Sequence, residues 1–148
     1  MTLEVDLVLV PVDGSDESSE AVEYALTIAE TYGAAIHAMY VLGEEAVRAI
    51  ETGAVDADEV ADETEFYTEG IRRQGEERGV DVSTSIAYGF STRIKTRHPG
   101  SVVLDTAESI DADFIVVPRE PTSGDPGEVL EKAAEYVLLY ASQPVLSV

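Results

Sequence analysis

The chain has 148 residues, 45% of them hydrophobic, and we expect a single domain, residues 1–148, that is long enough to bury a core. It has no cysteine, which excludes disulfides, thiolate metal sites and a cysteine nucleophile, and it has no leader and no apolar run of 18 residues, so we expect a cytoplasmic protein without a membrane partner. Its 30 acidic residues outnumber its 9 basic residues along the whole length, which predicts an acidic, solvated surface adapted to high salt, a halophilic source and no nucleic-acid partner.

Residues 5–12 form a nearly continuous apolar run rich in valine and leucine. Such a run favours a strand that is covered on both faces, as in the middle of a parallel sheet. Pro11 has no N–H group, which predicts that the last residues of this strand lie at the carboxyl edge of the sheet. Asp13 follows at that edge, beside the start of a helix, and this is where open α/β sheets bind ligands.

The first helix is predicted over residues 16–32, with Ser15 as its N-cap and Gly33 as its C-terminal stop. Residues 35–42 form the second predicted strand. It contains a lone histidine, His37, for which a packed or edge position is a better interpretation than a metal ligand. The buried stripe of the first helix, residues 16–32, is predicted to contain Ala21, Val22, Ala25, Leu26, Ile28, Ala29 and Tyr32.

Residues 43–56 are acidic and poorly patterned, which predicts a loop with a short helical piece. A second helix is predicted over residues 57–78 and ends at Gly79. The third predicted strand covers residues 80–88. The apolar stripe of the second helix is thin, so we expect one well-exposed face; the stripe consists of Val60, Tyr67 and Ile71.

A basic stretch, residues 90–98, reads as an insertion or arm. Arg93, Lys95 and Arg97 alternate along it, so they share one face if the segment is extended. Two interpretations remain open. The stretch is either a site for an anion or an acidic partner, or a protruding arm that neutralises the carboxylate-rich surface of its own chain or of a partner chain.

Pro99 predicts the start of a third helix, because proline is favoured in the first helical turn. Residues 113–118 repeat the pattern of the first strand, a buried run that ends in a proline. Residues 144–148 form the last predicted strand. The clearest helical period in the chain covers residues 127–142, with an inward face of Leu130, Ala133, Ala134, Val137, Leu138 and Ala141.

Five strands alternating with four helices predict an α/β fold with an open parallel sheet, helices on both faces and right-handed crossovers. If the strand order reverses beside the first strand, the edges after Val12 and Val117 are neighbours. The crevice between these edges is then the only obvious pocket. No turn carries Gly-x-Gly-x-x-Gly, which argues against a dinucleotide site.

Three stretches of the chain share features with one known family. They are Pro-Val-Asp-Gly-Ser at 11–15, Asp-Phe-Ile-Val-Val at 113–117, and residues 133–148, which end in Pro-Val-Leu-Ser-Val. Together they resemble the universal stress protein (UspA-like) family. The resemblance implies a Rossmann-like sheet of the adenine nucleotide alpha hydrolase type with strand order 3-2-1-4-5, and a homodimer made through the last strand, 144–148.

For one branch of that family, the resemblance also implies an ATP site in the crevice, with a phosphate loop of the form Gly-x2-Gly-x9-Gly-(Ser/Thr). Ser123 and Gly124 match an auxiliary Ser-Gly pair inside this loop. At the four loop positions, however, the chain has Pro118, Pro121, Glu131 and Lys132. On the adenosine side, the residues that match the family are Pro11, Val12, Asp13 and Val41.

Backbone N–H groups hold the phosphates in such loops, and proline removes this donor. We therefore expect a non-catalytic, dimeric stress-response protein with a degenerate ATP-binding loop and with no cofactor, metal or catalytic residue. The alternative is an ATP- or AMP-binding regulatory switch whose loop is rebuilt around Arg119, Lys132 or the basic stretch. A third hypothesis, an unrelated enzyme on a similar fold, lacks a catalytic constellation in the sequence.

Overall fold

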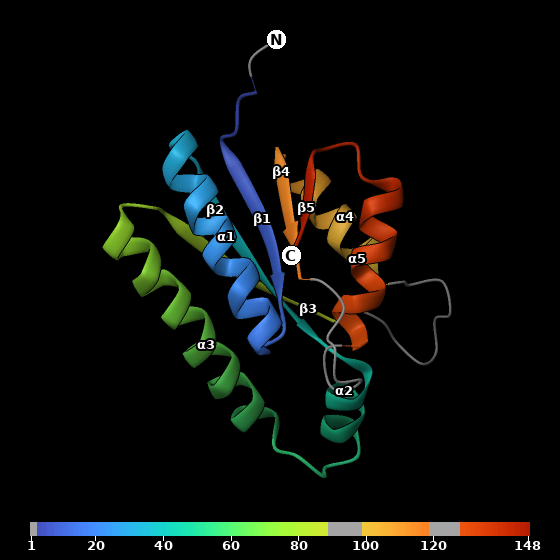
Figure 1. Cartoon of the computed structure of the whole chain (residues 1–148). Helices are drawn as coiled ribbons and strands as arrows, with labels where there is room; N and C mark the ends of the chain where they lie inside the picture. The colour runs from blue at the N-terminus through green and yellow to red at the C-terminus, as the bar shows by residue number, and fades with distance from the viewer. Residues whose placement is uncertain (1–2, 89–98, 119–127) are drawn as a thin grey trace.

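A computed structural model describes residues 3–88, 99–118 and 128–148 of the chain. Strands and helices alternate along it as expected, except that two helices follow one another between β2 and β3 (Figure 1). The strands are β1 (Leu7–Val12), β2 (Ala35–Leu42), β3 (Val82–Tyr88), β4 (Phe114–Val117) and β5 (Val145–Ser147). The helices are α1 (Asp16–Tyr32), α2 (Glu44–Glu51), α3 (Ala57–Arg78), α4 (Pro99–Ser109) and α5 (Glu128–Tyr140).

The five strands form one parallel sheet of order β3-β2-β1-β4-β5, which confirms the predicted fold. The central strand β1 pairs with β2 over its whole length, from Leu7 to Val12, and with β4 at Val8 and Leu9. The first and fourth strands are therefore neighbours, as the reversal of strand order predicted.

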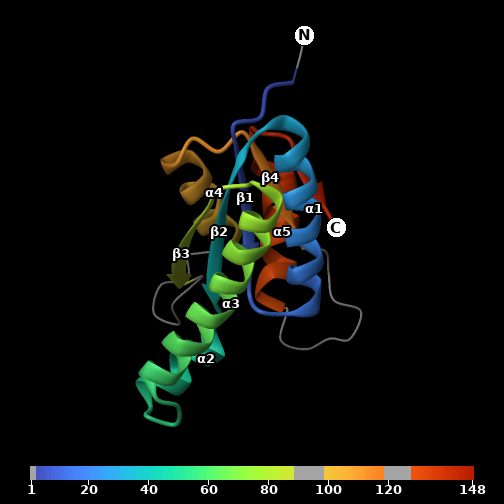
Figure 2. The same ribbon diagram turned by 90° about the vertical axis from the view of Figure 1, so that its left-hand side faces the viewer.

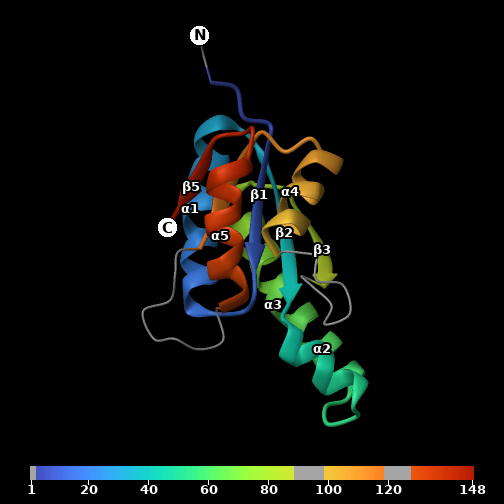
Figure 3. The same ribbon diagram turned by 90° about the vertical axis from the view of Figure 1, so that its right-hand side faces the viewer.

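Helices cover both faces of the sheet, with α1 and α3 on one face and α4 and α5 on the other (Figures 2 and 3). Successive residues of β1 point to opposite faces. Val8, Val10 and Val12 pack against α1, whereas Leu9 packs in the core beside α4 and α5. This double coverage is the reason why the strand is an almost unbroken apolar run.

The capping residues act as the sequence predicted. The Ser15 hydroxyl accepts the Ser18 N–H at 3.2 Å at the start of α1, and Gly33 has a φ of 67° at its end. Gly79 ends α3 in the same left-handed conformation. Four unpaired N–H groups at the start and four carbonyls at the end of each helix need such partners, which is why these residues fix the boundaries.

Several predicted boundaries and buried positions were wrong. Helix α2, residues 44–51, is the short helical piece expected within residues 43–56, but the count of four helices left it out. Strand β3 begins at Val82, because the Val80 N–H donates to the Gly75 carbonyl of α3 at 2.8 Å. Two side chains expected in the core, Tyr32 and Leu138, are 44% and 53% exposed.

The thin apolar stripe of α3 is completed by threonines. Thr64 and Thr68 are buried beside Ile71 on the face toward the sheet. Their hydroxyls donate to the carbonyls of Val60 and Thr64 at 2.8 and 3.0 Å, so each buried hydroxyl is satisfied within the helix.

No helix of the described residues is both long and apolar enough to cross a membrane. The basic stretch 90–98, with its predicted role as an insertion or arm, lies outside the described residues.

Candidate functional site

The carboxyl end of β1 leads into a tight turn that opens α1. The Asp13 Oδ1 atom accepts the Ser15 N–H at 2.9 Å. Gly14 between them has a φ of 82°, which glycine adopts without strain. A Cβ atom at this position would also lie 3.1 Å from the Tyr40 hydroxyl oxygen. The sequence Asp-Gly-Ser is therefore required by the backbone of the turn as well as by its capping role.

Asp13 is half-buried and keeps one carboxylate oxygen without a partner. Its Oδ1 atom belongs to the turn, but Oδ2 is buried and makes no hydrogen bond within the part of the chain that the structure describes. A buried acceptor without a donor is unfavourable, and native structures rarely leave one without a reason. This oxygen is therefore available to a hydroxyl or amide donor from outside the described residues.

Tyr40 on β2 supports the turn from the side of α1 and α3. Its hydroxyl donates to the Asp13 carbonyl at 3.2 Å, and its ring meets the Tyr67 ring edge-on at a centroid distance of 5.8 Å. The Tyr67 hydroxyl lies 3.0 Å from the hydroxyls of both Ser18 and Ser19 at the start of α1. These contacts fix the end of β1 relative to α1 and α3.

Burial raises the pKa of the Tyr40 hydroxyl, and the negative charge of Asp13 raises it further. The tyrosine therefore stays protonated, and it remains a hydrogen-bond donor at neutral pH. Tyr40 was not among the site residues predicted from the sequence. Its only signal was a hydroxyl near the end of a largely apolar strand, which ends at the same edge of the sheet as Asp13.

The predicted adenosine-side residues meet at the carboxyl ends of β1 and β2. Pro11 and Val12 are buried at the end of β1, and Val41 is buried one position from the end of β2. Val12 belongs to the core beside α1, whereas Val41 belongs to the core beside α4 and α5. The set therefore lines both faces of the strand ends, with Asp13 following directly after β1.

The one described histidine is held by serines. The His37 Nδ1 and Nε2 atoms lie 2.8 Å from the hydroxyls of Ser83 and Ser85 on the neighbouring strand, and burial lowers the pKa of the imidazole. The geometry fits the predicted packed or edge histidine. Among the described residues, no group of three or more histidine, aspartate or glutamate side chains is arranged to hold a metal ion.

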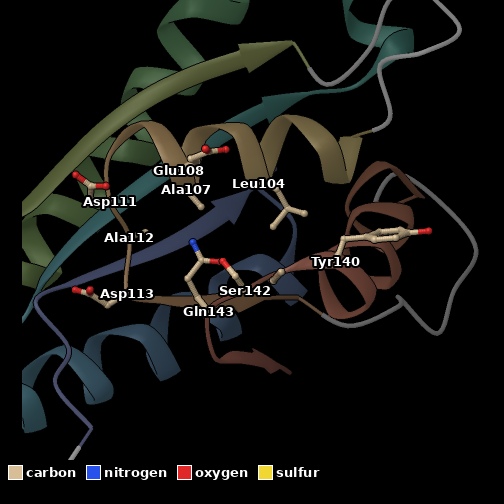
Figure 4. A pocket seen from close by; sticks show the side chains of 10 residues that line it. Leu104, Ala107, Glu108, Asp111, Ala112, Asp113, Tyr140, Ser142 and Gln143 are labelled. Atoms are coloured by element: carbon tan, nitrogen blue, oxygen red, sulfur yellow. The ribbon is translucent and has the colours of Figure 1, made fainter.

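Two cavities of the described residues lie away from the crevice between β1 and β4, so the expectation that the crevice is the only obvious pocket was wrong. One cavity of about 600 Å³ lies at the opposite edge of the sheet, between the C-terminal ends of α4 and α5 (Figure 4). Its lining includes Leu104, Asp113 and Gln143. A second cavity of about 280 Å³ lies between α2 and α3.

A sequence model of the universal stress protein family matches residues 5–148. The chain belongs to the universal stress protein family. A curated universal stress protein of Methanocaldococcus jannaschii is 28% identical over 144 residues, which are 95% of this chain and 80% of that protein.

Solved structures of the family agree with the fold. The universal stress protein UspA of Lactobacillus plantarum superposes with a TM-score of 0.70 at 20% identity and covers 99% of both chains. A family protein of Arabidopsis thaliana with AMP bound superposes with a TM-score of 0.63 at 17% identity, covering 97% of this chain and 90% of that chain. The order and direction of the strands are thus those of a universal stress protein.

The phosphate-loop positions of this universal stress protein are only partly described. Pro118 is buried directly after β4, and Glu131 and Lys132 lie near the start of α5. Ser123 and Gly124, which were predicted to lie in the loop, belong to residues 119–127, outside the described residues. The described part of the crevice therefore consists of the ends of β1, β2 and β4 and the Asp13 carboxylate.

Proposed function

We propose that this universal stress protein is a non-catalytic, dimeric stress-response protein whose phosphate loop no longer grips a triphosphate. The observation that carries the proposal is the position of Pro118. It follows β4 directly, where the ATP-binding branch of the family is expected to have the first loop glycine. Glutamate and lysine stand near the start of α5, at the positions of the last glycine and the hydroxyl residue.

The lost donors have a large effect on affinity. A hydrogen bond from an N–H group to a charged phosphate contributes roughly 1.5–3 kcal/mol, so the loss of two donors weakens binding by about 10²- to 10⁴-fold. Proline also fixes φ, which limits how closely the backbone approaches a ligand. The carboxylate of Glu131 adds repulsion to a polyphosphate, although salt screens this repulsion if the site is wet.

The contacts of the hydroxyl and imidazole groups support a non-catalytic function. A serine nucleophile needs a base within hydrogen-bond distance, and the base needs a partner that orients it. The Ser15 hydroxyl is used to cap α1. Both nitrogens of His37 contact serine hydroxyls, so no carboxylate orients the imidazole.

The edge strand β5 supports a homodimer through residues 144–148. In the described sheet β5 pairs only with β4, which leaves its outer backbone groups available to another strand. Phe114, Leu146 and Val148 lie on the same face beside this edge and are only partly buried. A second copy that pairs with β5 would cover these side chains.

Chromatography with light scattering in molar KCl tests the dimer. Deletion of residues 144–148, or the single change Leu146→Glu, should produce monomers or insoluble protein. The control is Phe66→Glu. Phe66 is 77% exposed and lies on α3, far along the chain from the edge strand β5. An unchanged dimer after the deletion would exclude this interface.

A second candidate function, an adenine-nucleotide switch, is favoured by the free oxygen of Asp13. Its buried Oδ2 atom could accept a ribose hydroxyl, and the neighbouring Pro11, Val12 and Val41 match the family on the adenosine side. The Arabidopsis relative carries AMP, a nucleotide with a single phosphate. A site that lacks the backbone N–H donors for a triphosphate should bind AMP at least as tightly as ATP.

Calorimetric titration with AMP and ATP in molar KCl separates the two functions. Under the leading proposal, ATP binds no more tightly than AMP, and neither reaches micromolar affinity. Micromolar affinity for ATP would overturn it. If AMP alone binds, Asp13→Asn should weaken AMP at least about 10-fold, because the anionic acceptor is lost, whereas Asp16→Asn in the exposed first turn of α1 should not.

The reverse experiment restores the family pattern. Pro118, Pro121 and Glu131 are replaced by glycine and Lys132 by serine in one variant. If the missing N–H donors explain the weak binding of ATP, the affinity of this variant for ATP should be higher by about 10²-fold or more. A folded variant that gains no affinity would contradict the explanation.

A further inference from the structure

An apolar cavity of about 280 Å³ lies between α2 and the first turns of α3. Its floor includes Leu42 at the end of β2, and its wall includes Ile86 of β3, which is 51% exposed. In all three views of the fold, α2 and this end of α3 extend beyond the carboxyl ends of the strands (Figures 1–3). The cavity therefore lies at the base of a protruding pair of helices.

The cavity follows from a mismatch of side-chain size between the two helices. Val47 and Ile50 are three positions apart, so they share one face of α2, and both line the cavity. On α3 the lining includes the small residues Ala57 and Ala61, which do not fill the space opposite them. The cavity is open to solvent on this side, because Ala57 and Ala61 are both exposed.

The one charged residue of the cavity lining is negative. Glu51 is the one carboxylate of its lining, and the Thr64 hydroxyl already donates to the Val60 carbonyl. The chain has eight carboxylates and one arginine between positions 44 and 63. An apolar interior beside negative charge complements a ligand that has an apolar body and a positive group.

This cavity is separate from the crevice of the proposed function. Its strand residues, Leu42 and Ile86, alternate with Val41 and Ala87, which pack in the core on the side of α4 and α5. No residue of its lining belongs to the adenosine-side set. A ligand in the cavity and a nucleotide at Asp13 would therefore occupy different places.

We propose that the cavity binds a small amphipathic amine, with its apolar chain between α2 and α3 and its ammonium group beside Glu51. At about 30 Å³ for a small group in a liquid, the volume holds on the order of ten non-hydrogen atoms. Octylamine fits this size and charge. For so small a ligand we expect a dissociation constant of roughly 0.1 mM.

Titration with octylamine in molar KCl tests the site, with octanol and octanoate as probes of the same length. Heteronuclear NMR should show shifts concentrated at Val47, Ile50, Val60 and Ile86. Octanol should bind about 3-fold more weakly than octylamine, and octanoate about 10-fold more weakly, because only the amine is attracted by the exposed Glu51 carboxylate and molar salt screens part of that attraction. Saturation with AMP should leave the octylamine affinity unchanged.

Two variants make the test specific. Ala61→Leu fills the cavity and should lower octylamine affinity at least about 10-fold, while an unchanged or higher melting temperature shows that the protein is folded. Glu51→Gln should reduce octylamine to the affinity of octanol. Glu59→Gln, a carboxylate of α3 outside the lining, is the control and should change the affinity less than twofold. Equal affinity in Ala61→Leu and the parent, or shifts spread over the acidic surface, would overturn the proposal.

Discussion

The hydroxyl of Tyr40 donates to the backbone carbonyl of Asp13 at 3.2 Å, so the second strand holds the turn that follows the first. Tyr40→Phe removes this hydrogen bond and should lower the free energy of unfolding by about 1 kcal/mol at neutral pH. Urea denaturation measures the difference. Tyr24→Phe, on the exposed face of α1, should change it by less than about 0.5 kcal/mol.

The dependence of stability on alkaline pH is a second test of Tyr40. The pKa of Tyr40 is raised in the folded protein, so the unfolded chain ionises first as the pH rises above 10.0. The stabilisation that depends on the neutral hydroxyl is complete below that pH and is lost as the pH rises through the folded-state pKa. The advantage of the parent over Tyr40→Phe should therefore shrink above pH 10. A constant difference would contradict the shift.

The lowered pKa of His37 predicts that the protein loses stability at mildly acidic pH. Burial lowers the pKa of its imidazole below 6.5, so the unfolded chain binds the proton first as the pH falls. The corresponding stability is present above pH 6.5 and is lost as the pH falls through the folded-state pKa. Between pH 7.5 and 5.5, His37→Gln should lose stability less steeply than the parent. Equal slopes in urea denaturation would show that His37 is not responsible.

Gly100 is predicted to be essential for the contact between α4 and α5. A Cβ atom at this position would overlap the Tyr136 side chain of α5. Gly100→Ala should therefore destabilise the fold by about 1–3 kcal/mol, even though alanine favours a helix. Gly70→Ala on α3 has open space around it and should stabilise the fold by up to about 1 kcal/mol. Thermal unfolding of both variants distinguishes packing from propensity.

Asp113 joins the fourth strand to the start of the first. Its Oδ2 atom accepts the N–H groups of Asp6 and Leu7 at 2.8 and 3.0 Å. Asp113→Ala leaves both donors unpaired and should lower the free energy of unfolding by roughly 2–3 kcal/mol. Asp105→Ala, on the exposed face of α4, should change it by less than about 0.5 kcal/mol. Similar values for both variants in urea denaturation would contradict this role.

The net charge of −21 predicts a strong requirement for salt. The screening length falls from about 10 Å at 0.1 M salt to about 3 Å at 1 M, so repulsion between surface carboxylates decreases. The melting temperature should rise steadily between 0.1 and 2 M KCl. Sucrose at matched osmolality is the control for effects unrelated to charge. A melting temperature that does not depend on KCl would remove the basis for expecting a halophilic source.

The sequence predicted the helix boundaries well where local residues determine them. Helices α1 and α3 have the predicted ends, because Ser15, Gly33 and Gly79 satisfy end groups through short-range contacts. Helix α2 was expected only as a short helical piece of a loop, since its two large apolar residues, Val47 and Ile50, give a weak pattern in an acidic segment. Its position depends on packing against α3, which no local pattern reports.

The candidate site was predictable only in part for the same reason. Asp13 was placed correctly after the first strand, because the change from apolar strand to Asp-Gly-Ser turn is local. The partnership of Tyr40 with Tyr67 joins residues 27 positions apart, and Asp113 reaches Leu7 across 106 positions. Such contacts depend on the assembled sheet. Ser123 and Gly124 stay predictions, because they lie outside the described residues.

The sheet order has a consequence for synthesis on the ribosome. The central strand β1 is made first, but its neighbour β4 begins only at Phe114. One edge of β1 therefore has no hydrogen-bonding partner while roughly a hundred further residues are translated. At about 5–20 residues per second, this interval lasts on the order of 5–20 seconds. A nascent chain stalled after β3 would carry an exposed apolar edge and would be a natural target for chaperones.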